Sequence, residues 1–143
     1  MIDGDELTRL SARELLHYQE LARAYQALTA LLAREGPVAL DQLAEQQERA
    51  EEATAELRAL QPLLAPHRLL ADRVPEAVRT LWRSSAELAA EAAAANTALL
   101  TQADFRLTAA LGRLGELQVG RRALSAYRGR HVGAGPLIAD RQA

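Results

Sequence analysis

The chain has 143 residues, a net charge of −2 and no cysteine, so it has the size of about one domain and cannot use disulfides, thiolate metal sites or cysteine nucleophiles. Alanine and leucine dominate while β-branched and aromatic residues are scarce, which favours helices over strands. No apolar run approaches the roughly 20 residues that cross a bilayer, and the opening MIDGDELTRL is acidic where a signal peptide is basic. We expect a cytoplasmic, all-α protein with no membrane insertion.

The first two helices are predicted over residues 5–34 and 38–61. In the first, leucines recur at helical spacing, and EGP at 35–37 ends it. The second shows a heptad-like stripe that includes Leu40, Ala50, Leu57 and Gln61. Residues 35–56 also hold seven carboxylates against Arg49, which predicts an acidic solvated face.

A proline-rich segment, 62–75, separates these helices from a long third one. Its three prolines oppose a continuous helix, and its leucines predict a packed connector with about one helical turn. From Pro75 to about Tyr127 no proline recurs, and an apolar stripe predicts a single helix with coiled-coil-like packing. Arginine outnumbers acidic residues from Arg106 onward.

Three glycines interrupt the end of this long helix, in LGRLGELQVGRR: Gly112, Gly115 and Gly120. Each costs about 1 kcal/mol relative to alanine in a helix interior. Two interpretations stay open. The glycines allow close approach of another helix or have no specific role, or they leave this part of the helix marginally stable until a partner packs on it.

Motifs that could carry chemistry are weak. ELLH, residues 14–17, has the Glu-x-x-His spacing of di-iron bundles, but Glu14 and His17 lack the second such element and the further glutamates that a site needs. Ser84 and Ser85 have no nucleophile elbow, and the lone Trp82 is more typical of core or rim packing than of a binding hot spot. We expect no enzyme activity, no metal and no cofactor.

The closing GAGP, residues 133–136, lacks the strand, helix and third glycine of a dinucleotide-binding loop. The arginines around it are too dilute for a nucleic-acid arm, so no nucleic-acid partner is expected. The remaining interpretations are an inert chain end or a tail anchored by Leu137 and Ile138. The predicted architecture is an elongated, antiparallel, partly coiled-coil three-helix domain over 1–127 and a flexible tail over 128–143.

This layout resembles FlgN-type flagellar export chaperones. The resemblance is carried by Asn96 with Leu99 and Leu100 in NTALL, by Tyr127 and Gly129 in YRG, and by the closing LIADRQA. The family's earlier asparagine is Ala93 here, and Arg128 separates the tyrosine from the glycine. The resemblance implies a type III export chaperone that binds the C-terminal segments of the hook–filament junction proteins FlgK and FlgL and delivers them to the export apparatus.

For such a role we expect a hydrophobic groove on the last helix that accepts an amphipathic helix of the client. The alternative is a structural adaptor, a homodimer that uses the same stripe as its seam. The expected partner-binding residues are Leu107, Leu111, Leu114, Leu117, Leu124, Tyr127, Leu137 and Ile138.

Overall fold

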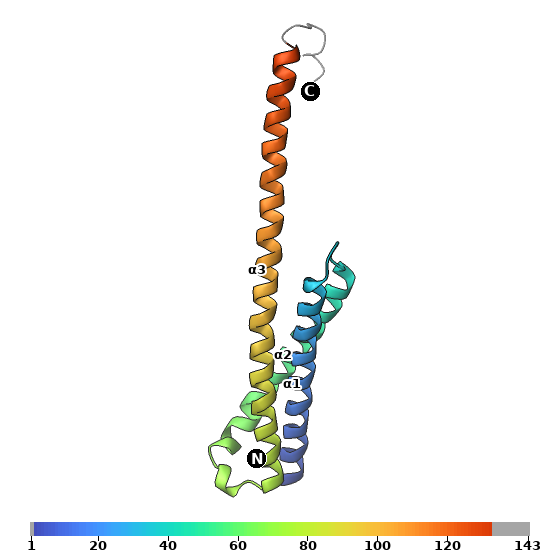
Figure 1. The fold of residues 1–143 in the computed structure, drawn as a ribbon. Coiled ribbons are helices and arrows are strands. Elements are labelled where there is room, and N and C mark those ends of the chain that lie inside the picture. Colours follow the sequence, from blue (N-terminus) through green and yellow to red (C-terminus); the bar gives the residue numbers. More distant parts are fainter. Residues whose placement is uncertain (1, 133–143) are drawn as a thin grey trace. The chain divides into compact units, whose positions relative to one another are not determined.

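The computed structural model describes residues 2–132 and contains three α-helices (Figure 1). These are α1 (Gly4–Ala33), α2 (Leu40–Arg68) and α3 (Glu76–Val132), with a short 3₁₀ helix, η1 (Ala71–Arg73), before α3. The described residues contain no strand, which confirms the predicted all-α, three-helix class. The chain divides into two compact units, residues 1–103 and 104–143.

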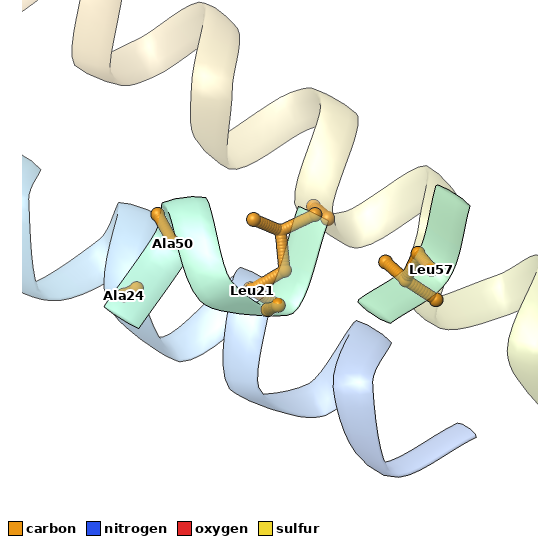
Figure 2. Close-up of a cluster of buried hydrophobic side chains, with 7 residues drawn as sticks. Leu21, Ala24, Ala50 and Leu57 are labelled. Atoms are coloured by element: carbon orange, nitrogen blue, oxygen red, sulfur yellow. The ribbon is translucent and has the colours of Figure 1, made fainter. Parts of the chain in front are cut away.

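The first unit has a core in two clusters to which all three helices contribute. At one end, Leu7 and Leu10 of α1 meet Leu60 and Leu64 of α2 and Val78 of α3. Further along lies the cluster of Figure 2, which is formed by Leu21, Ala22, Ala24, Ala50, Ala53, Leu57 and Ala92. The start of α1, the end of α2 and the start of α3 therefore share one end of the unit, so helices that follow each other in the chain are antiparallel, while α1 and α3 are parallel.

Local sequence explains where α1 begins and where it turns into α2. The Asp3 carboxylate accepts a hydrogen bond of 2.8 Å from the Glu6 backbone N–H, which satisfies a helix N–H that has no partner inside the helix. After α1, Gly36 has a φ of 89°, a left-handed conformation that other residues adopt only with strain. These two residues set the entry to α1 and the turn toward α2.

Helix α2 is longer than predicted, since it continues through Pro62 and Pro66 to Arg68. A proline inside a helix costs roughly 3 kcal/mol because it removes a backbone N–H and crowds the preceding turn. Both prolines are exposed, so water can reach the carbonyls they leave unpaired, while Leu60 and Leu64 are almost fully buried. Burial of a leucine contributes roughly 1.5–3 kcal/mol, so these two leucines help to hold the last turns of α2 in place.

The buried seam of α2 also differs from the predicted stripe. Ala50 and Leu57 are buried as expected, whereas Leu40 and Gln61 are exposed. The buried residues follow alternating steps of three and four: Ala50, Ala53, Leu57, Leu60 and Leu64. The seam is thus coiled-coil-like, but it continues along the proline-containing turns that were expected to form a connector.

Helix α3 is continuous through its three glycines and ends at Val132, five residues beyond the predicted end at Tyr127. The described part of the second unit, residues 104–132, is helical throughout. The predicted tail residues 133–143, with Leu137 and Ile138, lie outside the described residues.

Candidate partner-binding site

The predicted binding residues of α3 form an exposed row of leucines. We call Leu107, Leu111, Leu114, Leu117 and Leu124 the leucine stripe. At 100° per residue they occupy an arc of about 140° around the helix. Their exposed fractions run from 49% at Leu124 to 64% at Leu117. The five leucines therefore lie on one face of the helix, which is the geometry expected of a surface for another helix.

The segment that carries the stripe contains no buried residue. From Ala93 to Gly129, no described residue is buried. Eight large aliphatic or phenylalanine side chains in this stretch are exposed: Leu100, Phe105, Leu107, Leu111, Leu114, Leu117, Val119 and Leu124. Five of these side chains are the leucines of the stripe, and contiguous exposed apolar surface marks interaction sites. Phe105 and Val119 lie on the side opposite Leu107 and were not among the predicted residues.

Tyr127, one of the predicted partner-binding residues, does not lie in line with the leucine stripe. Its side chain is 61% exposed, but at 100° per residue it lies about 60° further round the helix than Leu124. The structure therefore places it beside the stripe rather than in line with it. Leu137 and Ile138 are outside the described residues, so they remain predictions.

Two arginines lie within the arc of the stripe. Arg121 and Arg128 follow Leu114 at intervals of seven residues, and Leu107 precedes Leu114 by seven. Seven residues make almost two helical turns, so these four residues form one line along α3, which we call the heptad line. Sequence reasoning did not include these arginines, although their seven-residue spacing was the signal that could have identified them.

The three glycines of α3 border open space. A Cβ atom at Gly112, Gly115 or Gly120 would meet nothing within 4 Å. The glycines lower the intrinsic helix stability of the same turns that carry the leucine stripe.

Within the first unit, Glu14 and His17 have separate partners. The Glu14 carboxylate, whose side chain is 2% exposed, pairs with the Arg68 guanidinium. His17 Nδ1 lies 3.2 Å from Glu20 Oε2, and its Nε2 lies 3.8 Å from Glu56 Oε2. Among residues 2–132 no group of three or more histidine, cysteine or carboxylate side chains could hold a metal ion.

Glu14 belongs to a polar cluster that joins all three helices. The Arg68 guanidinium carbon lies 5.4 Å from the centroid of the Trp82 ring, and Trp82 Nε1 donates a hydrogen bond of 2.9 Å to Ser11 Oγ. Burial raises the pKa of the nearby Tyr18 phenol above 10, the Glu14 charge raises it further, and Arg68 opposes the shift. Trp82 is partly buried and packs against the bundle core, and the cluster links α1, α2 and α3.

The first unit also has two apolar cavities that the predicted residues do not line. One, of about 690 Å³, lies between the start of α1 and the end of α2, where Leu7, Leu63 and Leu70 contribute to its wall. The other, of about 600 Å³, is lined from all three helices by residues that include Leu28, Leu43 and Leu99.

None of the described helices combines the length and the hydropathy needed to cross a membrane. Comparison with known proteins finds no matching family model, no matching curated protein and no matching solved structure.

Proposed function

We propose that this protein is a non-enzymatic, cytoplasmic chaperone of the flagellar type III export kind, which holds an amphipathic helix of a client on the leucine stripe of α3. The clients are the C-terminal segments of hook–filament junction proteins of the FlgK and FlgL kind. The observation that carries the proposal is the exposure of five leucines on one face of a helical segment without a single buried residue.

The chemistry of the stripe suits reversible capture of a helix. A client helix with apolar residues at i, i+3, i+4 and i+7 could remove these leucines from water, and burial of each is worth roughly 1.5–3 kcal/mol before the cost of ordering both partners. The glycine-containing turns would gain order only when the client binds. That cost lowers the net affinity, which favours release of the client to the export apparatus.

Titration calorimetry with the purified full-length chain tests the proposal. The C-terminal segments of the hook–filament junction proteins encoded in the same genome should bind with a measurable heat. The double variant Leu107→Gln, Leu114→Gln should bind at least about tenfold more weakly, since two anchors of the apolar face are lost.

The matched control is Phe105→Gln, Val119→Gln, which also removes two exposed apolar side chains but from the opposite side of α3. This variant should bind the client segments as the unmodified chain does. Equal weakening by both double variants, or no binding by the unmodified chain, would show that the stripe is not a client site.

A further inference from the structure

The heptad line differs in character between its two halves. Leu107 and Leu114 make the first half apolar, and Arg121 and Arg128 make the second half cationic. All four side chains are exposed, and within the described residues Arg121 and Arg128 have no carboxylate partner. A partner lying along this line would therefore bury apolar contacts at one end and face two positive charges at the other.

The surroundings strengthen the positive charge. Residues 104–129 contain five arginines against only Asp104 and Glu116, although the whole chain carries a net charge of −2. Complementary charges across an interface fix register and exclude wrong partners. The most suitable occupant is thus a helix that brings carboxylates to the cationic half.

A second copy of this chain fits less well, because Asp104 and Glu116, the carboxylates of residues 104–129, lie off the heptad line. A parallel pair of stripes would place Arg121 and Arg128 against the same arginines of the other copy, and an antiparallel pair centred on Leu117 would place Arg121 beside Arg113 of the other copy. Like charges placed opposite each other disfavour association. The acidic helix α2 of a second copy cannot bind the stripe either. Its apolar face, which includes Ala50, Leu57 and Leu64, is already buried in its own bundle.

An anionic membrane surface also fits less well than a helix. A helix that lies on a bilayer keeps its arginines on the polar face and buries a continuous apolar face. Here Arg121 and Arg128 stand on the apolar line itself, in register with Leu107 and Leu114. A protein helix can place a carboxylate opposite each arginine, where the bidentate geometry of a guanidinium pair adds specificity.

We propose that the partner of the stripe is a two-part amphipathic helix, apolar where it faces Leu107 and Leu114 and acidic where it faces Arg121 and Arg128. The inference rests on the proposed function and adds the charge and the register of the client. The arginines then select the partner, and the leucines supply most of the binding energy.

Two synthetic peptides of roughly 21 residues, three heptads long, test the inference. One carries leucine on the apolar face of one half and glutamate at the same positions of the other half; the second has lysine in place of each glutamate. Both are made in each order of the two halves, because either orientation on α3 is allowed. The full-length chain should bind the glutamate peptide at least about tenfold more tightly than the lysine peptide.

Charge reversal on the protein supplies the decisive comparison. The variant Arg121→Glu, Arg128→Glu should reverse the preference and bind the lysine peptide more tightly. The control Arg113→Glu, Arg122→Glu makes the same change in net charge at positions off the heptad line, and it should keep the preference for glutamate. Circular dichroism of both variants checks that the helices persist.

Several outcomes would overturn the inference. These are equal affinity for the two peptides, binding of neither, a dimer in sedimentation whose seam is the stripe, or binding to anionic lipid vesicles that is lost with Arg121 and Arg128. Capture of junction-protein segments that depends on Leu107 and Leu114 but not on Arg121 and Arg128 would leave the proposed function standing and remove only the acidic partner.

Discussion

The leucines of the bundle and the leucines of the stripe are the same residue type at the same helical spacing, but only the first have partners. Leu64 is 0% exposed among side chains from three helices, whereas Leu114 is 52% exposed on α3. Ion pairs and the polar cluster join the helices of the first unit, and the turns around the stripe contain three glycines. A periodic apolar face alone therefore does not distinguish a core from a binding surface.

The largest expected effect is on the bundle core. Leu64→Ala should lower the free energy of unfolding by about 2–5 kcal/mol, because it removes a fully buried side chain and leaves a cavity. Leu114→Ala should change it by less than about 0.5 kcal/mol, since the side chain is exposed. Urea denaturation followed by circular dichroism measures both. Similar losses from the two variants would mean that the stripe is itself part of a folded core.

The next effect concerns the ion pair between the buried Glu14 and the partly exposed Arg68. Glu14→Ala should cost about 1–3 kcal/mol, because it removes the carboxylate that accepts a charged hydrogen bond from Arg68, whose side chain is 35% exposed. Glu14→Gln, which keeps an oxygen acceptor, should cost less. Glu45→Ala, which breaks the exposed pair with Arg49, should cost less than about 1 kcal/mol. Equal losses of unfolding free energy for Glu14→Ala and Glu45→Ala would show that the polar cluster does not stabilise the bundle.

A smaller effect of opposite sign is expected at the glycines of α3. Gly112→Ala, Gly115→Ala and Gly120→Ala should each stabilise the helix by up to about 1 kcal/mol, because a Cβ atom meets no neighbour at these positions. Amide hydrogen exchange should slow in residues 104–129 of the triple variant, while exchange in α1 stays unchanged. Faster exchange in the triple variant would mean that the glycines are needed for packing.

The smallest effect is a dependence on alkaline pH. The pKa of the Tyr18 phenol is raised above 10 in the folded chain, mainly by burial. The unfolded chain therefore loses this proton first, and the contribution of Tyr18 is complete below pH 10 and is lost as the pH rises through the folded pKa. Tyr18→Phe should reduce this loss of stability in denaturation curves measured between pH 9 and pH 11. An identical pH dependence in the variant would exclude Tyr18 as its source.

Much of the fold could be predicted from the sequence, since helix spacing and the EGP stop are local signals. The continuation of α2 through Pro62 and Pro66 could not, because it depends on burial of Leu60 and Leu64 by residues that lie far away in the chain. The Glu14–Arg68 pair joins residues 54 positions apart, and no local pattern predicts such a contact.

The candidate site could be predicted in part, because helical spacing is a local signal. Helical spacing identified the leucines of α3 as one face, and the structure adds that nothing buries them within the described residues. Whether these leucines are exposed depends on whether other helices cover them. The sequence pattern alone therefore fits both a dimer seam and a groove for a client helix. Arg121 and Arg128 were not predicted as partner-binding residues, because the prediction used only the spacing of apolar residues.

The arginines of the heptad line also bear on the kinetics of capture. At physiological ionic strength the Debye length is about 8 Å, so an approaching acidic helix senses Arg121 and Arg128 more strongly than the net negative charge of the whole chain. Association should then be fast at low salt and slow as salt is added. The dissociation rate should respond mainly to the leucines, so that how quickly a partner is found and how long it stays are controlled by different halves of one helix face.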